Sequence, residues 1–450
     1  MCGDQKKKKV AIVGSGPSGF YAAEELLNND IQVDMFEKLS APFGLVRYGV
    51  APDHQKLKLS ARMFEKTAQK TGFHFYGNVE VGKDITIADL QENYHAVILC
   101  HGASLGRKPG IPGENLKGCY TATEFVGWYN GHPDFQNLAV DLSCKAVAII
   151  GHGNVSIDVA RILAKPVPEL AASDITSQAI KILSASHIEE IHVIGRRGPA
   201  QAKFTNQELR ELGEIDGVDV IVNQEDMELN PASAEEIADK KNFIAAKNIE
   251  LLCGYADKKP KDAQKKLIFH FLKNPLEVIG DDHVLAIRLA KNALSGAAYQ
   301  QQATQSDDSE ILPCGAVFFS IGYRGHSIPG INFDQRKSTY PNTFGKVAGE
   351  RNLYTAGWIK RGPTGIIGTN KPCAQETVAT LMADLANQDL DEKLGFSGIK
   401  NLLKNSPISF QQWQQLDTME QERGKEKSKV REKFITAIEC LEALQLLRIT

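Results

Sequence analysis

The chain has 450 residues, 42% of them hydrophobic, and its 52 basic and 55 acidic side chains leave a formal net charge of −3 at pH 7. This length is typical of two or three domains, and the balanced charge argues against a general nucleic-acid-binding protein. No apolar run is as long as a membrane-spanning helix, so we expect no membrane span.

The first predicted element is a short apolar run from Val10, followed by a glycine turn and an amphipathic helix, in the sequence VAIVGSGPSGFYAAEEL. Gly14, Gly16 and Gly19 have the spacing of a dinucleotide-binding turn, in which the backbone approaches a pyrophosphate at a helix N-terminus. The next predicted strand, IQVDMFEK, ends near Glu37. An acidic side chain there accepts hydrogen bonds from a ribose and repels a 2′-phosphate, which favours FAD or NAD.

A buried strand is predicted in HAVILCHGAS, with Cys100 as a small apolar filler. The Gly/Pro-rich stretch LGRKPGIPGENLKG after it predicts a passage into a second module.

The second module opens with another strand, glycine turn and helix, in AVAIIGHGNVSIDVARIL. Gly151 and Gly153 match the fingerprint, and Ser156 stands where a third glycine is usual. The later apolar run IEEIHVIGRRG ends in Arg196 and Arg197, whose guanidinium groups are suited to a 2′-phosphate and so favour NADP. A solvated strand end is the alternative interpretation of this pair.

Residues 165–187 lie between that helix and the arginine strand, and we interpret them as a surface excursion plus an added helix. The run AVFFSIGYRG near residue 325 predicts a return to the first module. The predicted fold is α/β with two Rossmann-like dinucleotide-binding domains: a discontinuous FAD domain (1–104 and 326–450) and an inserted NADP domain (105–325). At the C-terminus, Phe434, Ile438, Leu441 and Leu444 have helical spacing and predict a packed terminal helix.

Six longer blocks resemble the adrenodoxin reductase type of NADPH-dependent ferredoxin reductase, and they extend over most of the chain. They are VGSGPSGFYAAEEL, PFGLVRYGVAPDH, EFVGWYNGHPD, GHGNVSIDVARIL, GRRGPAQAKFTNQELREL and GWIKRGPTGIIGTNK. The resemblance implies FAD and NADP(H) in the two domains, and delivery of electrons to an iron–sulfur ferredoxin.

The same resemblance implies a set of binding residues for each cofactor. Those expected to line FAD are Ser18, Glu37, Leu45, Val81, Trp358, Gly365, Ile366 and Ile367. Those expected to line NADP are His152, Gly153, Asn154, Val155, Arg196, Arg197 and Glu208, and Gly365 is also expected to meet the nicotinamide. Backbone N–H groups of residues 365–368 are placed to face the flavin edge, unless this is an ordinary glycine-rich loop.

His54 and Glu211 resemble polar residues that the family places near the reacting rings, where they would tune the flavin or relay a proton. Asp158 is a third candidate for that region. The alternatives are a loop histidine and a solvated helix carboxylate. No histidine or cysteine spacing indicates a metal site.

The eight cysteines are scattered and contain no C-x-x-C pair, which argues against a redox dithiol and against a built-in iron–sulfur module. We therefore expect an external electron acceptor, and a cytoplasmic protein with reduced thiols. Lys240, Lys241 and Lys247 lie where the family docks acidic ferredoxins, although an exposed lysine run is also typical of a solvated face. A monomer is expected.

Two other functions fit the double fingerprint. One is the NADPH-oxidising subunit of a larger complex, as in glutamate synthase small subunits, although their cysteine-rich N-terminal extension is missing here. The other is an NADP(H)-sensing binding protein without turnover.

Overall fold

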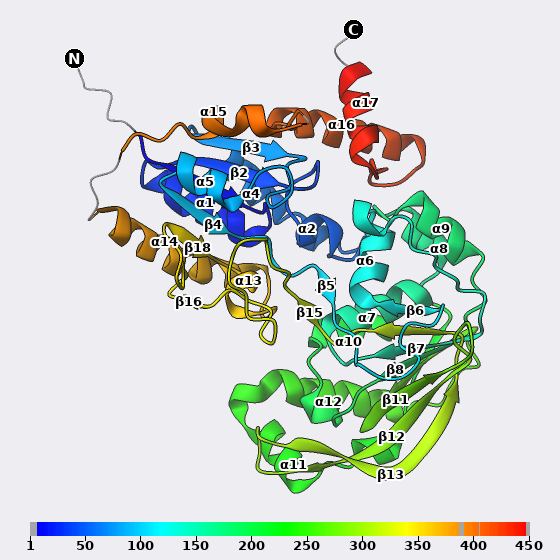
Figure 1. The fold of residues 1–450 in the computed structure, drawn as a ribbon. Helices are drawn as coiled ribbons and strands as arrows, with labels where there is room; N and C mark the ends of the chain where they lie inside the picture. The colour runs from blue at the N-terminus through cyan, green and yellow to red at the C-terminus, as the bar shows by residue number, and fades with distance from the viewer. Residues whose placement is uncertain (1–6, 387–390, 405, 447–450) are drawn as a thin grey trace. The chain divides into compact units, whose positions relative to one another are not determined.

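The computed structural model describes residues 7–386, 391–404 and 406–446. The chain divides into two compact units, each described here by itself. Unit 1 comprises residues 1–105, 130–133 and 323–450, and unit 2 comprises residues 106–129 and 134–322. Figure 1 shows the elements of both units along the chain.

Unit 1 is built on a 7-stranded sheet of order β16-β17-β18-β4-β1-β2-β3. The five strands from β18 to β3 pair in parallel, and β16 and β17 add an antiparallel edge. The strands are β1 (Lys9–Val13), β2 (Gln32–Glu37), β3 (Phe73–Gly77), β4 (Ala96–Leu99), β16 (Asn342–Thr343), β17 (Lys346–Val347) and β18 (Leu353–Thr355).

Both faces of this sheet are buried, which explains why its central strands are apolar without interruption. Val10 and Ile12 of β1 belong to one hydrophobic cluster, and Ala11 and Val13 belong to another. The first face is covered by α1 (Pro17–Asn28), α14 (Asn370–Ala386) and α16 (Phe410–Glu426), and the second by α5 (Ile87–Asn93) and α15 (Phe396–Ile399). The remaining helices of unit 1 are α2 (Leu45–Tyr48), α3 (Gln55–Lys58), α4 (Ala61–Ala68), α13 (Trp358–Arg361) and α17 (Ala437–Leu446).

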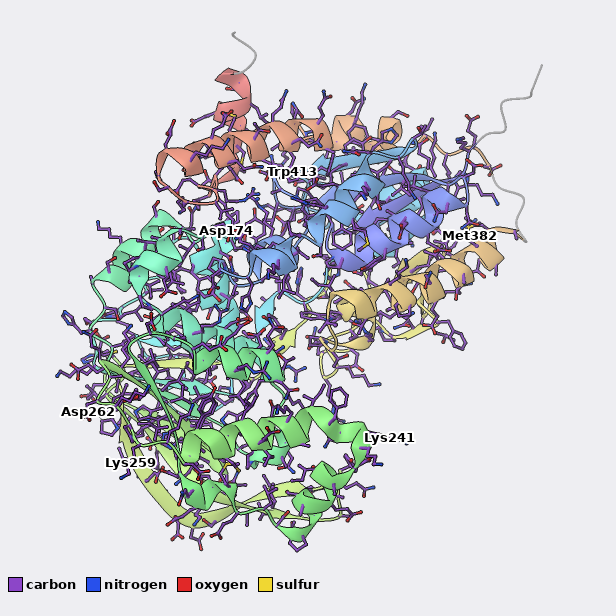
Figure 2. All side chains as sticks on the ribbon, turned by 180° about the vertical axis from the view of Figure 1, so that it is seen from behind. Asp174, Lys241, Lys259, Asp262, Met382 and Trp413 are labelled. Carbon is purple, nitrogen blue, oxygen red and sulfur yellow. The ribbon has the colours of Figure 1, made fainter. Side chains whose placement is uncertain are left out.

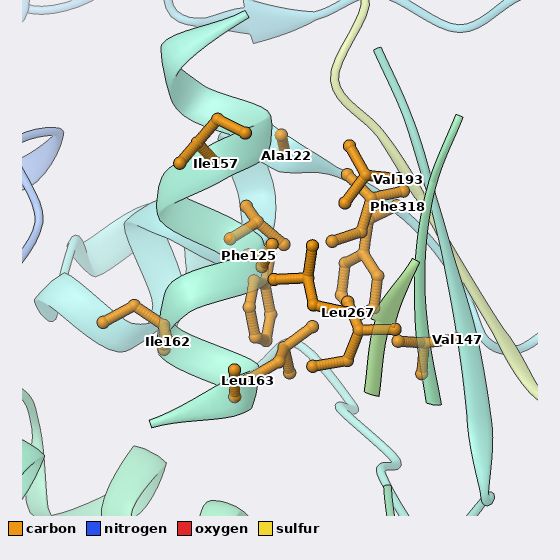
Figure 3. Close-up of a cluster of buried hydrophobic side chains, with 14 of the residues drawn as sticks. Ala122, Phe125, Val147, Ile157, Ile162, Leu163, Val193, Leu267 and Phe318 are labelled. Atoms are coloured by element: carbon orange, nitrogen blue, oxygen red, sulfur yellow. The ribbon is translucent and has the colours of Figure 1, made fainter. Parts of the chain in front are cut away.

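Unit 2 is built on a 6-stranded parallel sheet of order β6-β14-β7-β8-β10-β9. The strands are β6 (Cys119–Thr121), β7 (Ala146–Ile150), β8 (Glu190–Ile194), β9 (Val218–Val222), β10 (Lys265–His270) and β14 (Ala316–Phe319). Figure 3 shows one face of this sheet, where Ile157 and Leu163 of α7 (Asn154–Ala164) pack with Val193, Leu267 and Phe318 of the strands.

The other face of the unit 2 sheet packs on a 3-stranded antiparallel sheet, which is formed by β11 (Lys273–Ile279), β12 (Ala286–Ser295) and β13 (Gln302–Pro313). Short strands β5 (Leu105–Gly106) and β15 (Tyr323–Arg324) lie at two of the four points where the chain passes from one unit to the other. The other helices of unit 2 are α6 (Ala122–Asn130), α8 (Val167–Ala171), α9 (Ser177–Ser184), α10 (Asn206–Leu212), α11 (Pro231–Ala238) and α12 (Phe243–Ala256).

The excursion at 165–187 differs from the expectation, because it is part of the core of unit 2 rather than a surface addition. It forms two helices, α8 and α9, and Leu170, Ile175 and Leu183 are buried in the main cluster. The segment therefore adds buried apolar surface to the sheet face that α7 covers.

The C-terminal prediction was partly wrong. A terminal helix is present, but α17 begins at Ala437, so Phe434 precedes it, and Ile438 on its first turn is 68% exposed. Leu441 and Leu444 do pack on the core. The helix begins late because Thr436 caps it: its hydroxyl accepts a hydrogen bond from the N–H of Glu439 (3.1 Å).

Candidate functional site

The first glycine turn joins β1 to α1 in unit 1, and its three glycines have different roles. A Cβ on Gly14 (φ +102°) would lie 2.7 Å from the carbonyl oxygen of Cys100, and one on Gly19 would lie 2.2 Å from the carbonyl oxygen of Gly14. These two glycines are required by the packing of the protein itself. A Cβ on Gly16 would meet nothing within 4 Å, and the N-cap of α1 has no side-chain hydrogen bond. Open space at an uncapped helix N-terminus is the environment that a pyrophosphate requires, so the turn fits a dinucleotide.

Glu37 ends β2 beside this turn, as expected from the sequence. Its carboxylate accepts hydrogen bonds from the N–H of Ser15 (2.9 Å), the hydroxyl of Ser15 (2.7 Å) and the N–H of Leu39 (3.1 Å). The carboxylate therefore fixes the turn, and since an ionised carboxylate has about four acceptor positions, it keeps room for a ribose hydroxyl.

Several of the predicted FAD residues are brought to the same turn. Leu45 follows Gly44, whose added Cβ would lie 3.2 Å from the Cα of Gly16. Trp358 follows Gly357, whose Cβ would lie 2.5 Å from the hydroxyl oxygen of Ser18. Segments near residues 18, 45 and 358 thus meet around one turn. Val81 lies instead in the cluster on the other sheet face, where it bridges to Ile85.

The predicted flavin-edge loop leads directly into α14. A 3₁₀ turn, Ile367–Thr369, precedes that helix, and the indole N–H of Trp358 donates to the carbonyl of Thr364 at the start of the loop (3.0 Å). Ile366 is 73% exposed, and a Cβ on Gly368 would meet nothing within 4 Å. The loop thus offers backbone and an apolar side chain to a ligand, next to the start of a 17-residue helix.

His54 lies in unit 1 as the N-cap residue of α3. Its carbonyl accepts hydrogen bonds from the N–H groups of Leu57 (3.1 Å) and Lys58 (3.4 Å), and its side chain is half-buried. The backbone of His54 is thus fixed by the helix that it begins.

The second glycine turn, in unit 2, repeats the division of roles. A Cβ on Gly151 (φ +136°) would lie 2.1 Å from the carbonyl oxygen of Ser320, whereas one on Gly153 would meet nothing within 4 Å. Ser156 does more than replace a glycine. Its buried hydroxyl accepts from the N–H of Gly153 (3.0 Å) and donates to the carbonyl of Gly153 (2.5 Å), so it fixes the turn. The sequence reasoning missed this role.

The side chains that follow Gly151 in the second turn are hydrogen-bonded to or packed against other parts of unit 2. The ring of His152 packs 4.7 Å from that of Phe271, and its Nε2 lies 3.2 Å from the carbonyl oxygen of Val193. Burial lowers the pKa of His152 to about 4, so the ring is neutral and Nε2 donates to that carbonyl. The amide oxygen of Asn154 accepts from the N–H of Thr205 (2.8 Å), and Val155 packs on the core.

Arg196 and Arg197 lie directly after β8, beyond Gly195, as expected from the sequence. Arg196 is exposed and Arg197 is partly buried. The carbonyls of the two residues are held by the amide of Asn292 (2.7 Å) and the N–H of Leu272 (3.1 Å). These two hydrogen bonds fix the backbone of the pair.

Two carboxylates of α10 were predicted near the coenzyme. The N–H of Glu208 donates to the hydroxyl of the capping residue Thr205 (3.4 Å), and Glu211 accepts a hydrogen bond from the amide of Gln207 (3.0 Å). Both side chains belong to unit 2, whereas His54 belongs to unit 1.

Asp158 has a structural partner that the sequence did not reveal. It accepts a hydrogen bond from the guanidinium of Arg161 (2.6 Å), which is 2% exposed. The carboxylate compensates a buried charge on α7, which accounts for its presence there.

The three lysines predicted for docking differ in their surroundings. Lys240 and Lys241 are exposed on a 3₁₀ turn, Lys240–Asn242, and Lys241 is labelled in Figure 2. Lys247 is paired with Glu250 (2.6 Å). Because Glu250 offsets the charge of Lys247, Lys240 and Lys241 contribute most of the net positive charge of this group.

Comparisons with known proteins agree with this geometry. Residues 8–260 match the family described as pyridine nucleotide-disulphide oxidoreductase. The chain is 42% identical, over 96% of its length and 98% of the relative's, to NADPH-ferredoxin reductase FprA of Mycobacterium tuberculosis. The chain belongs to the pyridine nucleotide-disulphide oxidoreductase family. It is also 41% identical to mitochondrial NADPH:adrenodoxin oxidoreductase of Salvelinus fontinalis, over 96% of this chain and 90% of that one.

A solved structure leads to the same assignment. Mycobacterium tuberculosis FprA in complex with NADPH matches with a TM-score of 0.93 and 40% identity, covering 98% of this chain and 100% of that one. The predicted fold, with two dinucleotide-binding domains, and membership of the adrenodoxin reductase type are thereby confirmed. Among the described residues, none of the helices is both long and apolar enough to span a bilayer.

Proposed function

We propose that this chain is an NADPH-dependent ferredoxin reductase, in which NADPH reduces a bound FAD and single electrons pass to an iron–sulfur ferredoxin. One observation carries the proposal. Two glycine turns with the same open position are followed by opposite charges, Glu37 beside the first and Arg196 and Arg197 beyond the second. The first arrangement suits a ribose diol and the second a 2′-phosphate.

Unit 1 holds FAD in this proposal. The open face of Gly16 receives the pyrophosphate at the N-terminus of α1, and Glu37 accepts from the adenosine ribose. Leu45, Val81, Trp358, Gly365, Ile366 and Ile367 are the proposed contacts to the rest of the cofactor. When bound, FAD supplies the step that the amino acids cannot, since it accepts a hydride and releases electrons singly.

Unit 2 holds NADP(H). The open face of Gly153 receives the pyrophosphate, and the guanidinium groups of the exposed Arg196 and the partly buried Arg197 bind the 2′-phosphate. Because the ring of His152 is packed inside the protein, we expect its backbone to be the part that faces the coenzyme. Asn154, Val155 and Glu208 complete the proposed coenzyme site.

His54 and Glu211 are proposed to hold or move a proton near the reacting rings, since a histidine and a carboxylate can exchange protons near neutral pH. Asp158 is proposed for the same region, and its ion pair with Arg161 supports a further role in fixing the position of α7.

The partner is proposed to be an acidic ferredoxin that binds a surface including Lys240, Lys241 and Lys247. The supporting argument is electrostatic: exposed charges steer an oppositely charged partner and increase the rate of encounter. We propose that the protein works as a monomer in the cytoplasm.

The test combines cofactor analysis with two assays on the purified chain. We expect a yellow protein that releases FAD rather than FMN on denaturation, that reduces a dye with NADPH, and that reduces cytochrome c only slowly until a ferredoxin is added. FMN in place of FAD, or no flavin after reconstitution, would contradict the proposal. Coenzyme binding without dye reduction would indicate a sensor instead.

A further inference from the structure

A loop of unit 1, residues 40–48, lies directly on the first glycine turn. The N–H of Phe43 donates to the carbonyl of Ser15 (3.0 Å), and Gly44 approaches the Cα of Gly16 so closely that an added Cβ would lie 3.2 Å away. This loop therefore forms a wall of the space that Gly16 leaves open.

The loop has a conformation that its own sequence does not favour. Phe43 has φ +82°, in the left-handed region that a bulky residue rarely adopts. Such a residue keeps this backbone only where its surroundings fix it, so the contacts around Phe43 decide whether the wall stays in place.

The Phe43 ring packs against Phe20 and Phe64 of the N-terminal part of the unit, and a third ring contact comes from the C-terminal part of the chain. The ring of Trp413 on α16 meets the ring of Phe43 edge to face, with centroids 5.1 Å apart and planes at 87°, and Trp413 is labelled in Figure 2. Figure 1 shows α16 beside β3 in this unit, which agrees with the contacts between these two elements. An aromatic pair of this geometry stabilises beyond its buried area.

A buried ion pair fixes the other end of the loop. One guanidinium nitrogen of Arg47 on α2 donates to both carboxylate oxygens of Glu420 on α16, at 2.7 and 2.8 Å. Arg47 is 8% exposed and Glu420 is 3% exposed, and the Nε–H of Arg47 has no hydrogen-bond partner among the described residues. Burial opposes the charge of Arg47, but Glu420, together with Tyr48 and Asp417, more than offsets it, so the pKa of Arg47 is raised. Glu420 is thus the main compensation for this cation.

Glu420 is itself held by a following segment of the chain. The N–H of Phe434 donates to its carboxylate (3.0 Å), and Arg431 donates to it as well (3.3 Å). The carboxylate therefore cannot move away from Arg47 without breaking two further contacts.

We propose that Trp413 and Glu420 are positioning residues, which hold the loop 40–48 on the first glycine turn and thereby set how tightly FAD is retained. The inference rests on the proposed function, in that the first turn is the FAD site. Neither residue is among the proposed cofactor contacts, and each acts through a residue of the loop, Phe43 or Arg47.

The test measures FAD release from the full-length holoprotein, followed by flavin fluorescence after dilution into apoprotein-free buffer. Trp413→Ala and Glu420→Gln should each release FAD at least about tenfold faster than the wild type. Trp413→Phe keeps a ring against Phe43 and should restore most of the retention. The matched control is Ile408→Ala, because Ile408 is 1% exposed in the same C-terminal segment, but its backbone pairs with Gly77 at the end of β3 and not with a residue of the loop.

The comparison with the control separates positioning from general destabilisation. If Ile408→Ala lowers the melting temperature as much as Trp413→Ala does and yet releases FAD at the wild-type rate, the proposal stands. Equal release rates for these two variants would overturn it.

A second measurement does not depend on FAD. The N–H groups of Phe43, Val46 and Tyr48 are hydrogen-bonded within or beneath the loop, and in apoprotein they should exchange with deuterium faster in Trp413→Ala than in Ile408→Ala. Unchanged exchange would overturn the proposal. A wild-type protein that binds no FAD, with faster loop exchange in Trp413→Ala, would contradict the proposed function alone.

Discussion

Substitution of Gly16 by alanine should separate cofactor binding from folding. Its φ of −74° is allowed for alanine, and the added Cβ meets nothing within 4 Å in the protein. An alanine costs up to about 1 kcal/mol relative to glycine at an N-cap, but it restricts the unfolded chain by a similar amount. The melting temperature of the apoprotein should therefore change by no more than about 2 °C.

FAD binding should respond differently, because the methyl group occupies the space proposed for the pyrophosphate. Forcing one extra methyl group into a packed contact costs about 1–3 kcal/mol. At about 1.4 kcal/mol per decade, this weakens FAD binding by roughly 5- to 150-fold. Titration of apoprotein with FAD, followed by quenching of flavin fluorescence, gives the dissociation constant for the wild type and for Gly16→Ala.

Gly19→Ala is the matched control within the same turn. Its Cβ would lie 2.2 Å from the carbonyl oxygen of Gly14, so this variant should lower the melting temperature of the apoprotein itself. An unchanged FAD dissociation constant in Gly16→Ala would refute the assignment of this open space to the cofactor.

Three further predictions concern single residues or pairs. Arg196→Ala/Arg197→Ala should raise the KM for NADPH by on the order of a hundredfold or more, at roughly 1.5–3 kcal/mol for each of the two lost charged contacts. NADH turnover and flavin content should stay unchanged in steady-state dye reduction, and an unchanged coenzyme preference would move the NADP site elsewhere. Charge reversal of the exposed lysines in Lys240–Asn242 should raise the KM for ferredoxin and make ferredoxin-dependent cytochrome c reduction less sensitive to salt between about 0.05 and 0.5 M. If the variant and the wild type respond equally to salt, docking lies on another surface. The hydrogen bond to Asp34 (2.8 Å) raises the pKa of His74. The stabilisation that this pair gives the folded state is therefore complete below about pH 6.5 and is lost as the pH rises through the raised pKa. His74→Ala should lower the melting temperature more at pH 6 than at pH 9, and an equal decrease at both pH values would refute the coupling.

The parts of the fold that were predicted correctly depend on local signals. Both glycine turns, the strand ending at Glu37 and the strand preceding Arg196 are read from residues within one strand, turn and helix unit. The start of α17 was also readable, because Thr436 and Glu439 form the capping pattern of a helix N-terminus, but spacing of apolar residues alone placed Phe434 in the helix.

The sequence also did not reveal the roles of two side chains whose partners lie within one helix turn. From the sequence, Ser156 was interpreted as a weaker substitute for a glycine, and Asp158 as a third candidate for the region of the reacting rings. The structure shows a hydroxyl that closes the turn and a carboxylate that compensates Arg161. In both cases the partner is three residues away, and the sequence shows the spacing without showing which side chains are buried.

The remaining information is not local at all. Sequence spacing does not distinguish Gly14 from Gly16. The structure does, because a side chain at Gly14 would clash with Cys100, whereas a side chain at Gly16 would enter open space that is proposed for the cofactor. Likewise, Arg47 and Glu420 are 373 residues apart in sequence, so nothing in the block PFGLVRYGV indicates that its arginine is buried against the C-terminal part of the chain. A glycine fingerprint therefore identifies where a dinucleotide belongs, whereas the contacts that hold the walls of the site come from residues without any recognisable motif, and they have to be read from the structure.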